Sequence, residues 1–268
     1  MKDIEIKDTE ISKKRPSKTL LFLEVRALLE LAAYFIAMPL LQMAPKGNGE
    51  PVMVIPGFTA GDWATLPMRK YLTNRGYSAH GWGLGINLGY SEELDQKLSL
   101  RLIELYKRYG KKINLIGWSL GGTYARELAR WSPDLVRCVM TIGSPFAMTP
   151  KATNVWQLYE YLSGEKIDEM DKELFRRMQS PPPVPTTSIF SSGDGVVPPE
   201  CSLECSAAHT ENIHVYGSHC GLPHNPFVLW VIADRLAQHE TEWKPFDWTK
   251  LRSILFPMQV HPKRLLTA

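Results

Sequence analysis

Long uncharged apolar runs are what this 268-residue sequence lacks most clearly. Its most apolar stretch, residues 20–41, carries Glu24, Arg26 and Glu30, so the longest uncharged run is residues 31–41. A membrane-spanning helix needs about 20 consecutive apolar residues. A secretory signal needs a charged region directly before its apolar core and a small-residue cleavage site after it. We expect neither, and predict a helix over residues 20–45 that packs on the domain or makes a peripheral contact with a membrane surface.

Cysteine is also scarce, and the four that occur have no metal-binding spacing. The sequence contains no Cys-x-x-Cys pair, and Cys201 and Cys205 lack the partners that a zinc site requires. The remaining two are Cys138 and Cys220. This usage predicts reduced thiols, no bound metal and a cytoplasmic location.

A strong charge of one sign is absent as well. Lys and Arg number 31 against 28 Asp and Glu, which gives a formal net charge of +3. With no basic aromatic module beside it, this charge predicts no nucleic-acid partner. The glycine-rich stretch 81–89 has Leu88 where a dinucleotide fingerprint needs its third glycine, so we expect no cofactor. The oligomeric state is left open.

The most informative motif is Gly117-Trp118-Ser119-Leu120-Gly121-Gly122. It follows the apolar run 113–116 and precedes a helix-forming stretch, which is the strand–turn–helix context of a nucleophile elbow in α/β-hydrolases. Glycines two residues before and after the serine let strand and helix pass closely. We predict that Ser119 is a nucleophile, against the simpler interpretation of a glycine-rich turn.

An acid and a histidine follow in the chain order that this fold requires. Asp194 lies in a turn directly after the strand-like residues 186–191, and His219 lies in a loop after the next strand-like run, 213–216. Asp194 would orient the His219 ring, and His219 would take the Ser119 proton. Together the three residues form a candidate catalytic triad.

Each of these assignments has an alternative. Asp194 precedes a glycine, which is common in ordinary turns. His224 competes with His219, although Asn225-Pro226 after it looks like the start of a helix, where structural histidines are frequent. Cys220 is a conceivable rival nucleophile, but it has no elbow around it.

The oxyanion hole is predicted from two backbone amides. The start of the helix after the elbow places the Leu120 amide beside Ser119, where a developing oxyanion would meet a donor. Residues 52–59 form an apolar run ending in Pro56-Gly57-Phe58, and Phe58 is the expected second donor. A simple turn is the alternative at this second position.

Taken together, these motifs resemble the bacterial esterase/lipase branch of the α/β-hydrolase superfamily. The resemblance covers about residues 50–240 and includes Gly143-Ser144-Pro145-Phe146, with Phe146 where bacterial lipases often have His. It implies a serine carboxylic-ester hydrolase that works through an acyl-enzyme on a small or lipid-like acyl ester. An acyltransferase on the same triad and a catalytically silent binding protein of the same fold are the alternatives.

The expected architecture is a mostly parallel sheet with helices on both faces. Strands are predicted near 52–56, 77–81, 113–117, 137–142, 186–191 and 213–216, and helices near 64–74, 92–108, 120–131 and 226–238. We assign 46–248 to the hydrolase domain, 1–19 to a mobile charged N-terminus and 249–268 to a tail. Residues 146–185 are too long for a simple connection and are predicted to form a helical cap, unless they pack elsewhere. The residues expected to line the acyl pocket are Trp118, Trp156, Tyr159 and Phe175.

Overall fold

The computed structural model describes residues 15–169, 172–239 and 242–247. Most of the predicted mobile N-terminus and the whole of the predicted tail, 249–268, lie outside the described residues. Residues 15–19 do not fit the prediction of a mobile segment. Arg15 Nε donates to the Lys151 carbonyl at 2.8 Å, and a helix begins at Lys18.

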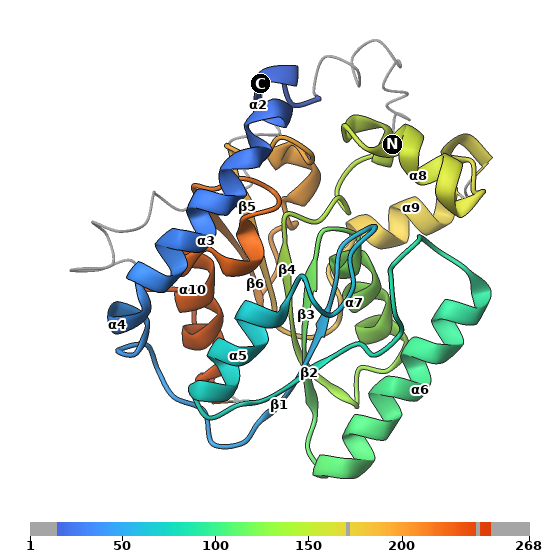
Figure 1. The fold of residues 1–268 in the computed structure, drawn as a ribbon. Coiled ribbons are helices and arrows are strands. Elements are labelled where there is room, and N and C mark those ends of the chain that lie inside the picture. The colour runs from blue at the N-terminus through green and yellow to red at the C-terminus, as the bar shows by residue number, and fades with distance from the viewer. Residues whose placement is uncertain (1–14, 170–171, 240–241, 248–268) are drawn as a thin grey trace.

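Six parallel strands form one sheet in the order β2-β1-β3-β4-β5-β6 (Figure 1). Because all six run in the same direction, their carboxyl ends meet at one edge, which is where open α/β sheets bind ligands. Each predicted strand is present within a few residues. The strands are β1 (Pro51–Ile55), β2 (Ser78–Gly81), β3 (Ile113–Trp118), β4 (Val136–Ile142), β5 (Thr186–Ser191) and β6 (Thr210–Val215).

Four helices cover the two faces of the sheet. The alternation of side chains along β1 explains both layers, since Val52 and Val54 enter one apolar core while Met53 and Ile55 enter the other. The first core is shared with α5 (Leu66–Asn74) and α10 (Pro226–Leu236), and the second with α6 (Glu92–Tyr109) and α7 (Leu120–Trp131). The central strands are buried on both sides.

The N-terminal apolar segment is not the single helix that the sequence predicts. It consists of α2 (Lys18–Phe22), the 3₁₀ turn η1 (Leu23–Arg26), α3 (Ala27–Ile36) and α4 (Met38–Leu41). Pro39 lies in the first turn of α4, where its missing amide is tolerated, but within one continuous helix it would remove a hydrogen bond. The inner face of the segment packs on the domain through residues such as Tyr34 and Leu41. No helix of the described residues is both long and apolar enough to span a membrane.

The insertion after β4 folds into α8 (Trp156–Ser163) and α9 (Lys172–Gln179), with two short 3₁₀ turns, η2 (Pro150–Ala152) and η3 (Ile167–Glu169). Buried Arg126 of α7 fastens its far end, because it donates to the carbonyls of Met178 and Ser180 at 3.0 and 2.8 Å. The same guanidinium pairs with Glu204 and lies 3.7 Å from the centre of the Phe146 ring. Both helices therefore stay near α7 and the carboxyl edge of the sheet (Figure 1).

Candidate active site

Ser119 lies at the turn between β3 and α7 in a backbone conformation that serine rarely adopts. Its φ is 54° and its ψ is −128°. Residues with a side chain rarely adopt a positive φ, and this conformation costs on the order of 1–3 kcal/mol. The surrounding glycines make this turn possible. A side chain at Gly117 would collide with the backbone of Gly121 and Gly122, and one at Gly121 would collide with the Ile55 carbonyl.

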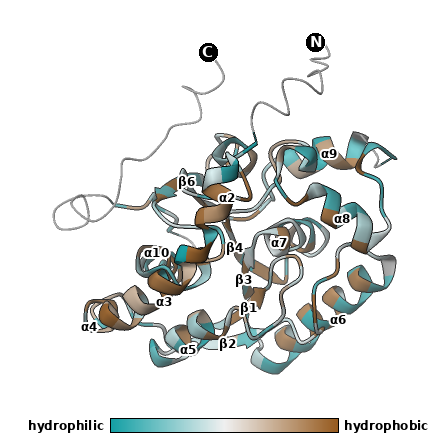
Figure 2. Ribbon diagram, turned by 45° about the horizontal axis from the view of Figure 1, so that its top comes forward, coloured by the Kyte–Doolittle hydropathy of each residue, from teal (hydrophilic) through white to brown (hydrophobic). Residues whose placement is uncertain are grey.

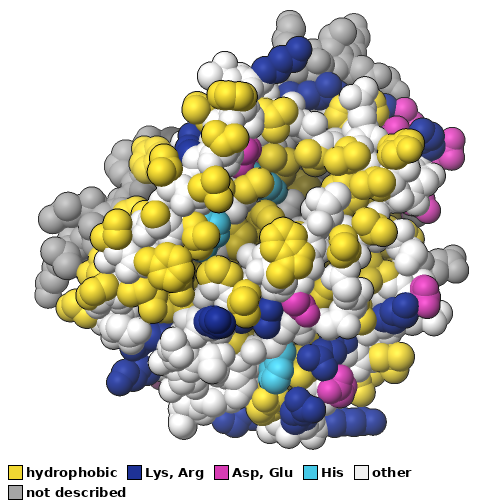
Figure 3. Space-filling model, in the orientation of Figure 1, with side chains coloured by type: hydrophobic (Ala, Val, Ile, Leu, Met, Phe, Trp, Pro, Cys, Tyr) yellow, Lys and Arg dark blue, Asp and Glu magenta, His cyan; other side chains and the backbone are white. Residues whose placement is uncertain are grey.

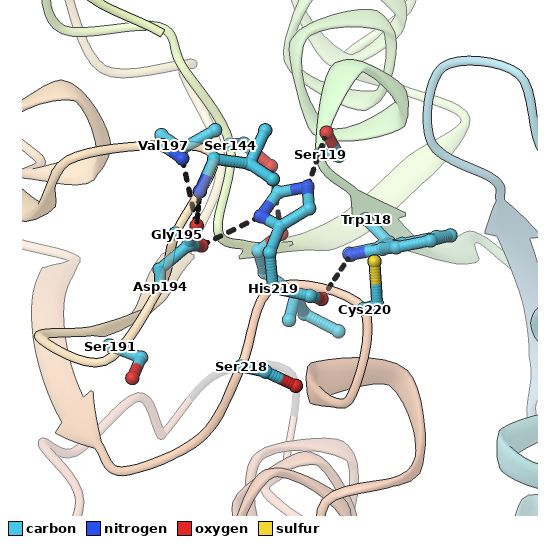
Figure 4. A network of polar contacts seen from close by, with 12 residues as sticks. Trp118, Ser119, Ser144, Ser191, Asp194, Gly195, Val197, Ser218, His219 and Cys220 are labelled. Carbon is cyan, nitrogen blue, oxygen red and sulfur yellow. Dashed lines mark hydrogen bonds and ion pairs between the residues drawn. The ribbon is translucent and has the colours of Figure 1, made fainter. Parts of the chain in front are cut away.

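The three predicted catalytic side chains lie in one hydrogen-bonded chain (Figure 4). His219 Nε2 lies 2.9 Å from Ser119 Oγ, and His219 Nδ1 lies 2.7 Å from Asp194 Oδ2. All three residues are at least 93% buried, with exposed fractions of 7% for Ser119, 2% for Asp194 and 4% for His219. Residues that are 100 and 25 positions apart in the sequence are thus brought into direct contact at the carboxyl edge of the sheet.

Two backbone amides hold the Asp194 carboxylate in place. Its Oδ1 accepts hydrogen bonds from the amides of Val196 and Val197, at 2.8 and 2.7 Å, while Oδ2 remains directed at His219. This turn follows β5, as predicted. Since each oxygen has its own partner, the carboxylate is fixed in the orientation that can receive the His219 Nδ1 proton.

The His219 imidazole is electrostatically prepared to carry a proton. Burial lowers the pKa of His219, but the charge and hydrogen bond of Asp194, with a smaller contribution from Glu24, raise the pKa above its ordinary value. Trp118 supports the loop from below, because its Nε1 donates to the His219 carbonyl at 3.1 Å and its ring lies 5.7 Å from the imidazole.

The rival residues do not occupy catalytic positions. His224 Nε2 lies 3.0 Å from the Ala27 carbonyl of α3, and burial lowers its pKa. Desolvation, and then the charge of Glu24, raise the pKa of the Cys220 thiol to about 12. A thiol with this pKa carries almost no thiolate near neutral pH and is a poor nucleophile.

Of the two residues predicted to supply the oxyanion hole, Leu120 directly follows Ser119, and Phe58 directly follows a glycine that packs against Ser119. Leu120 is the first residue of α7, so its amide has no carbonyl partner within the helix. A Cβ atom on Gly57 would lie 2.9 Å from the Ser119 Cβ, which shows how closely the loop before Phe58 approaches. The role of both amides stays a prediction.

Sequence reasoning missed the residue that braces this loop. Asn87 is 1% exposed, and its side-chain amide donates to the Pro56 carbonyl at 2.9 Å. Its backbone also accepts from Thr59 and donates to Ala60, at 2.7 and 2.8 Å. The only signal in the sequence was an asparagine within the glycine-rich stretch 81–89, and nothing in the sequence shows that it is buried.

A cavity of about 440 Å³ opens beside Ser119 and is lined in part by the insertion, whose role as a cap stays a prediction. Trp156 and Tyr159 line it, as predicted, and the Tyr159 ring lies 5.5 Å from that of Phe58. Trp118 and Phe175 were assigned to the pocket but do not line this cavity. Trp118 instead packs beneath the His219 loop. On α9, Leu174 and Met178 line the cavity instead of Phe175.

Contacts of charged side chains of the N-terminal segment with the loops around Asp194 and His219 were also missed. Glu24 accepts hydrogen bonds from the backbone of both the Asp194 and the His219 loop, and Glu30 accepts from Ser218. The available signal was the presence of three charged residues in an otherwise apolar stretch. Within the described part of the chain, no cluster of His, Cys, Asp or Glu could hold a metal ion.

Comparisons with solved structures identify the architecture. The chain aligns with lipase B of Aspergillus fumigatus at a TM-score of 0.56 and 18% identity, over 75% of this chain and 55% of the lipase. It aligns with a soluble variant of monoglyceride lipase from Saccharomyces cerevisiae, solved with a substrate analog, at a TM-score of 0.51 and 14% identity, over 72% of this chain and 89% of that one.

The chain has the α/β-hydrolase fold. No model of a protein family matches it, and no curated protein matches its sequence. The hydrolase fold predicted from the motifs is confirmed, whereas the bacterial esterase/lipase branch stays a prediction. At these identities the likeness concerns the fold, so the chemistry must be argued from the side chains of the site.

Proposed function

We propose that this protein is a serine hydrolase that cleaves carboxylic esters through an acyl-enzyme intermediate. The observation that carries the proposal is the buried hydrogen-bonded chain from Ser119 through His219 to Asp194, with distances of 2.9 and 2.7 Å. A strained serine, an imidazole and a carboxylate in this order form the arrangement that activates a serine hydroxyl for acyl transfer.

In the first half of the reaction, Ser119 Oγ attacks the ester carbonyl carbon while His219 Nε2 takes the hydroxyl proton. The negative charge that develops on the carbonyl oxygen is stabilised by the backbone amides of Phe58 and Leu120. Asp194 stabilises the imidazolium. His219 then donates the proton to the alcohol oxygen as the ester bond breaks, and the acyl group remains on Ser119.

In the second half, water attacks the acyl carbon while His219 takes one of its protons. Collapse of the second tetrahedral intermediate breaks the bond to Ser119 Oγ, which regains its proton, and the carboxylic acid leaves. An alcohol or thiol acceptor in place of water would give acyl transfer on the same residues, so the nature of the acceptor separates these two activities.

The cavity favours an apolar, lipid-like acyl group. Aromatic and aliphatic side chains from the cap and from α7 line it next to Ser119, among them Trp156, Tyr159 and Leu174. The similar solved structures include a lipase and a monoglyceride lipase, which agrees with a lipid-like ester.

The decisive test is a panel of p-nitrophenyl esters from acetate to palmitate, assayed with the wild type and with Ser119→Ala. We expect Ser119→Ala to lower kcat/KM by about 10⁴-fold or more, with an unchanged circular dichroism spectrum. A fluorophosphonate probe should label the wild type at Ser119 and leave the variant unlabelled. A folded variant with full esterase activity would contradict the proposal, and a wild type that is neither active nor labelled would favour a silent binding protein.

A further inference from the structure

The carboxylate of Glu24 accepts three backbone hydrogen bonds, although it lies far from the triad in the sequence. Its Oε1 accepts from the amides of Gly195 and His219, at 2.8 and 2.9 Å, and its Oε2 accepts from the amide of Cys220 at 2.8 Å. Gly195 directly follows Asp194. One side chain therefore bonds the backbone next to the triad acid and the backbone of the triad base itself.

The Asp194 and His219 loops make further close contacts with the N-terminal segment. Arg26 donates to the Gly193 carbonyl on the other side of Asp194, and Glu30 accepts from the Ser218 amide and hydroxyl at 2.9 and 2.7 Å. A side chain at Gly195 would collide with the Leu20 backbone, and one at Gly221 with the Glu30 carboxylate. The loops thus have glycine where the N-terminal segment approaches most closely.

The two catalytic loops need such a connection because they leave different strands. The Asp194 loop follows β5 and the His219 loop follows β6, so a small shift of either loop changes the distance between the acid and the base. Ser191 also joins them, through the amide and carbonyl of Gly217, but Gly217 lies two residues before His219. Glu24 bonds the backbone of His219 itself and of Gly195, the residue directly after Asp194.

We infer that Glu24 is a positioning residue for the triad, which holds the Asp194 and His219 loops at the separation that catalysis requires. This inference rests on the proposed esterase function. Glu24 touches neither Ser119 Oγ nor the reacting atoms, and it acts through the backbone amides of the two loops. Because its charge also contributes to the proton affinity of His219, its removal should change the pH profile as well as the rate.

The experiment compares Glu24→Gln and Glu24→Ala with Glu30→Gln. A glutamine at position 24 keeps the size of the side chain but replaces one accepting oxygen by an NH₂ group, which then faces a backbone amide donor. Glu30→Gln is the matched control, since it disturbs a similar number of hydrogen bonds from the same segment. Those bonds reach Arg26 and, of the two catalytic loops, only the His219 loop at Ser218, so Glu30 does not join the two loops as Glu24 does.

We expect both Glu24 variants to lower kcat on p-nitrophenyl acetate, and the rate of fluorophosphonate labelling, by about 10- to 100-fold, the effect of a misplacement near 1 Å. KM should change little. The acid limb of the pH profile should shift to lower pH, because the loss of the Glu24 charge lowers the pKa of His219 and leaves Asp194 as the main negative charge facing it. Glu30→Gln should keep kcat within about threefold of the wild type, although it should lower Tm by about as much as the Glu24 variants do.

Two outcomes would overturn the inference. In the first, the Glu24 variants label and turn over at the wild-type rate with an unshifted pH profile. In the second, Glu24→Gln and Glu30→Gln lose kcat equally and in proportion to their Tm, which is the result of a merely structural role. A wild type that does not label at all would instead overturn the proposed function, so the two failures are distinguishable.

A different observation concerns the outer face of the same segment. Between Thr19 and Met43 the only charged residues are Glu24, Arg26 and Glu30, and all three are directed at the domain by the hydrogen bonds described above. The side chains that remain exposed are almost entirely apolar, and α3 and α4 are among the hydrophobic ribbons of Figure 2. The most exposed are Phe22, Val25, Leu28, Leu29, Phe35, Ile36 and Met43, at 64–81%.

This apolar face adjoins the cleft. Figure 3 shows apolar side chains gathered over α2 and α3 and continuing around the hollow next to them. Two further large apolar side chains are also exposed, Tyr161 of α8 at 83% and Trp63 at 71%. A contact between proteins usually has about one hydrogen bond per 100–200 Å², whereas the exposed side chains from Thr19 to Met43 offer only two polar groups, Thr19 and Gln42.

We propose that the outer face of α2–α3 docks on a lipid surface, where acyl chains need no polar partners. The test is flotation of the purified protein with phosphatidylcholine vesicles, with Phe22→Ser/Leu28→Ser/Leu29→Ser as the variant. The matched control is Leu100→Ser, an equally apolar side chain that is 66% exposed on α6. We expect the wild type and the control to float with the vesicles, and the triple variant to lose at least about tenfold in the bound fraction.

Failure of the wild type to float would overturn this docking proposal. So would a wild-type dimer in solution that the triple variant dissociates, since a second copy of the chain would then be the occupant. Flotation does not depend on turnover, so its result is independent of the ester-hydrolase proposal and of Glu24.

Discussion

The two sides of the cleft are built in different ways. On the proposed catalytic side, Ser119, Asp194 and His219 are nearly completely buried and joined in one hydrogen-bonded chain. On the proposed acyl side, α8 has no fully buried side chain, and Trp156 and Tyr159 are half-buried. In a preorganised centre, any displacement of a catalytic side chain lowers the rate. A substitution in a partly exposed cavity wall instead changes which substrates fit. The chemistry and the selectivity should therefore respond to different substitutions.

The largest expected effect separates the two histidines. His219→Ala removes the general base and should lower kcat/KM for p-nitrophenyl acetate by about 10⁴-fold or more. His224→Ala loses only the contact with the Ala27 carbonyl, so it should lower Tm and leave kcat/KM within about tenfold. Steady-state kinetics and thermal unfolding of both variants check this, and the reverse ranking of the two histidines would contradict the assigned triad.

The pH dependence tests the electrostatics of the same side. His219 must be neutral to accept the Ser119 proton, and its pKa is raised above the ordinary value of 6.5, chiefly by Asp194 acting against burial. Activity should therefore fall as the pH drops through a value above 6.5. Asp194→Asn removes the charge that raises the pKa, so its acid limb should move to lower pH, with a loss in kcat of about 10⁴-fold. The measurement is kcat/KM from pH 5 to 9, and an unmoved acid limb in Asp194→Asn would contradict it.

On the acyl side, Trp156→Ala or Tyr159→Ala should change selectivity more than rate. An acetyl group reaches little beyond the reacting carbon, whereas each methylene buried against the cap gains about 0.8 kcal/mol, or about fourfold in kcat/KM. Phe175→Ala is the matched control from the same insertion, because Phe175 does not line the cavity. The p-nitrophenyl ester panel measures this, and equal losses at every chain length would mean that the cap does not receive the acyl chain.

The smallest effect is expected at Cys220, which directly follows His219 in the sequence. Its thiol has a pKa of about 12, so it contributes no nucleophile near neutral pH. Cys220→Ala should keep kcat/KM within about threefold of the wild type. A loss comparable to that of Ser119→Ala would show that the thiol takes part in catalysis.

Only part of the lining of the cavity could be predicted from the sequence, and its role as an acyl pocket stays a prediction. Trp156 and Tyr159 line the cavity, but Phe175 does not, because the direction of a side chain depends on how a helix is rotated about its axis. That rotation is fixed by tertiary contacts such as those of Arg126 and by the ion pair between Arg177 and Glu127 of α7. An aromatic residue in an amphipathic helix does not specify which neighbour it faces.

What the sequence determined by itself is local. The elbow, the acid after β5 and the histidine after β6 were all readable because glycine spacing and strand ends constrain the backbone within a few residues. A cytoplasmic location, inferred from the cysteines, stays a prediction.

Only the tertiary structure decided the parts that depend on distant contacts. From the sequence, the N-terminal segment was predicted to be one apolar helix that contains three charged residues. Only the structure shows that Glu24 bonds to residues 171 to 196 positions away. The role of Asn87 could not be predicted either, because its side chain bonds to Pro56, which is 31 positions away in the sequence. A buried charge or amide is stable only where its partners converge, and that convergence exists only once the sheet has brought the loops together.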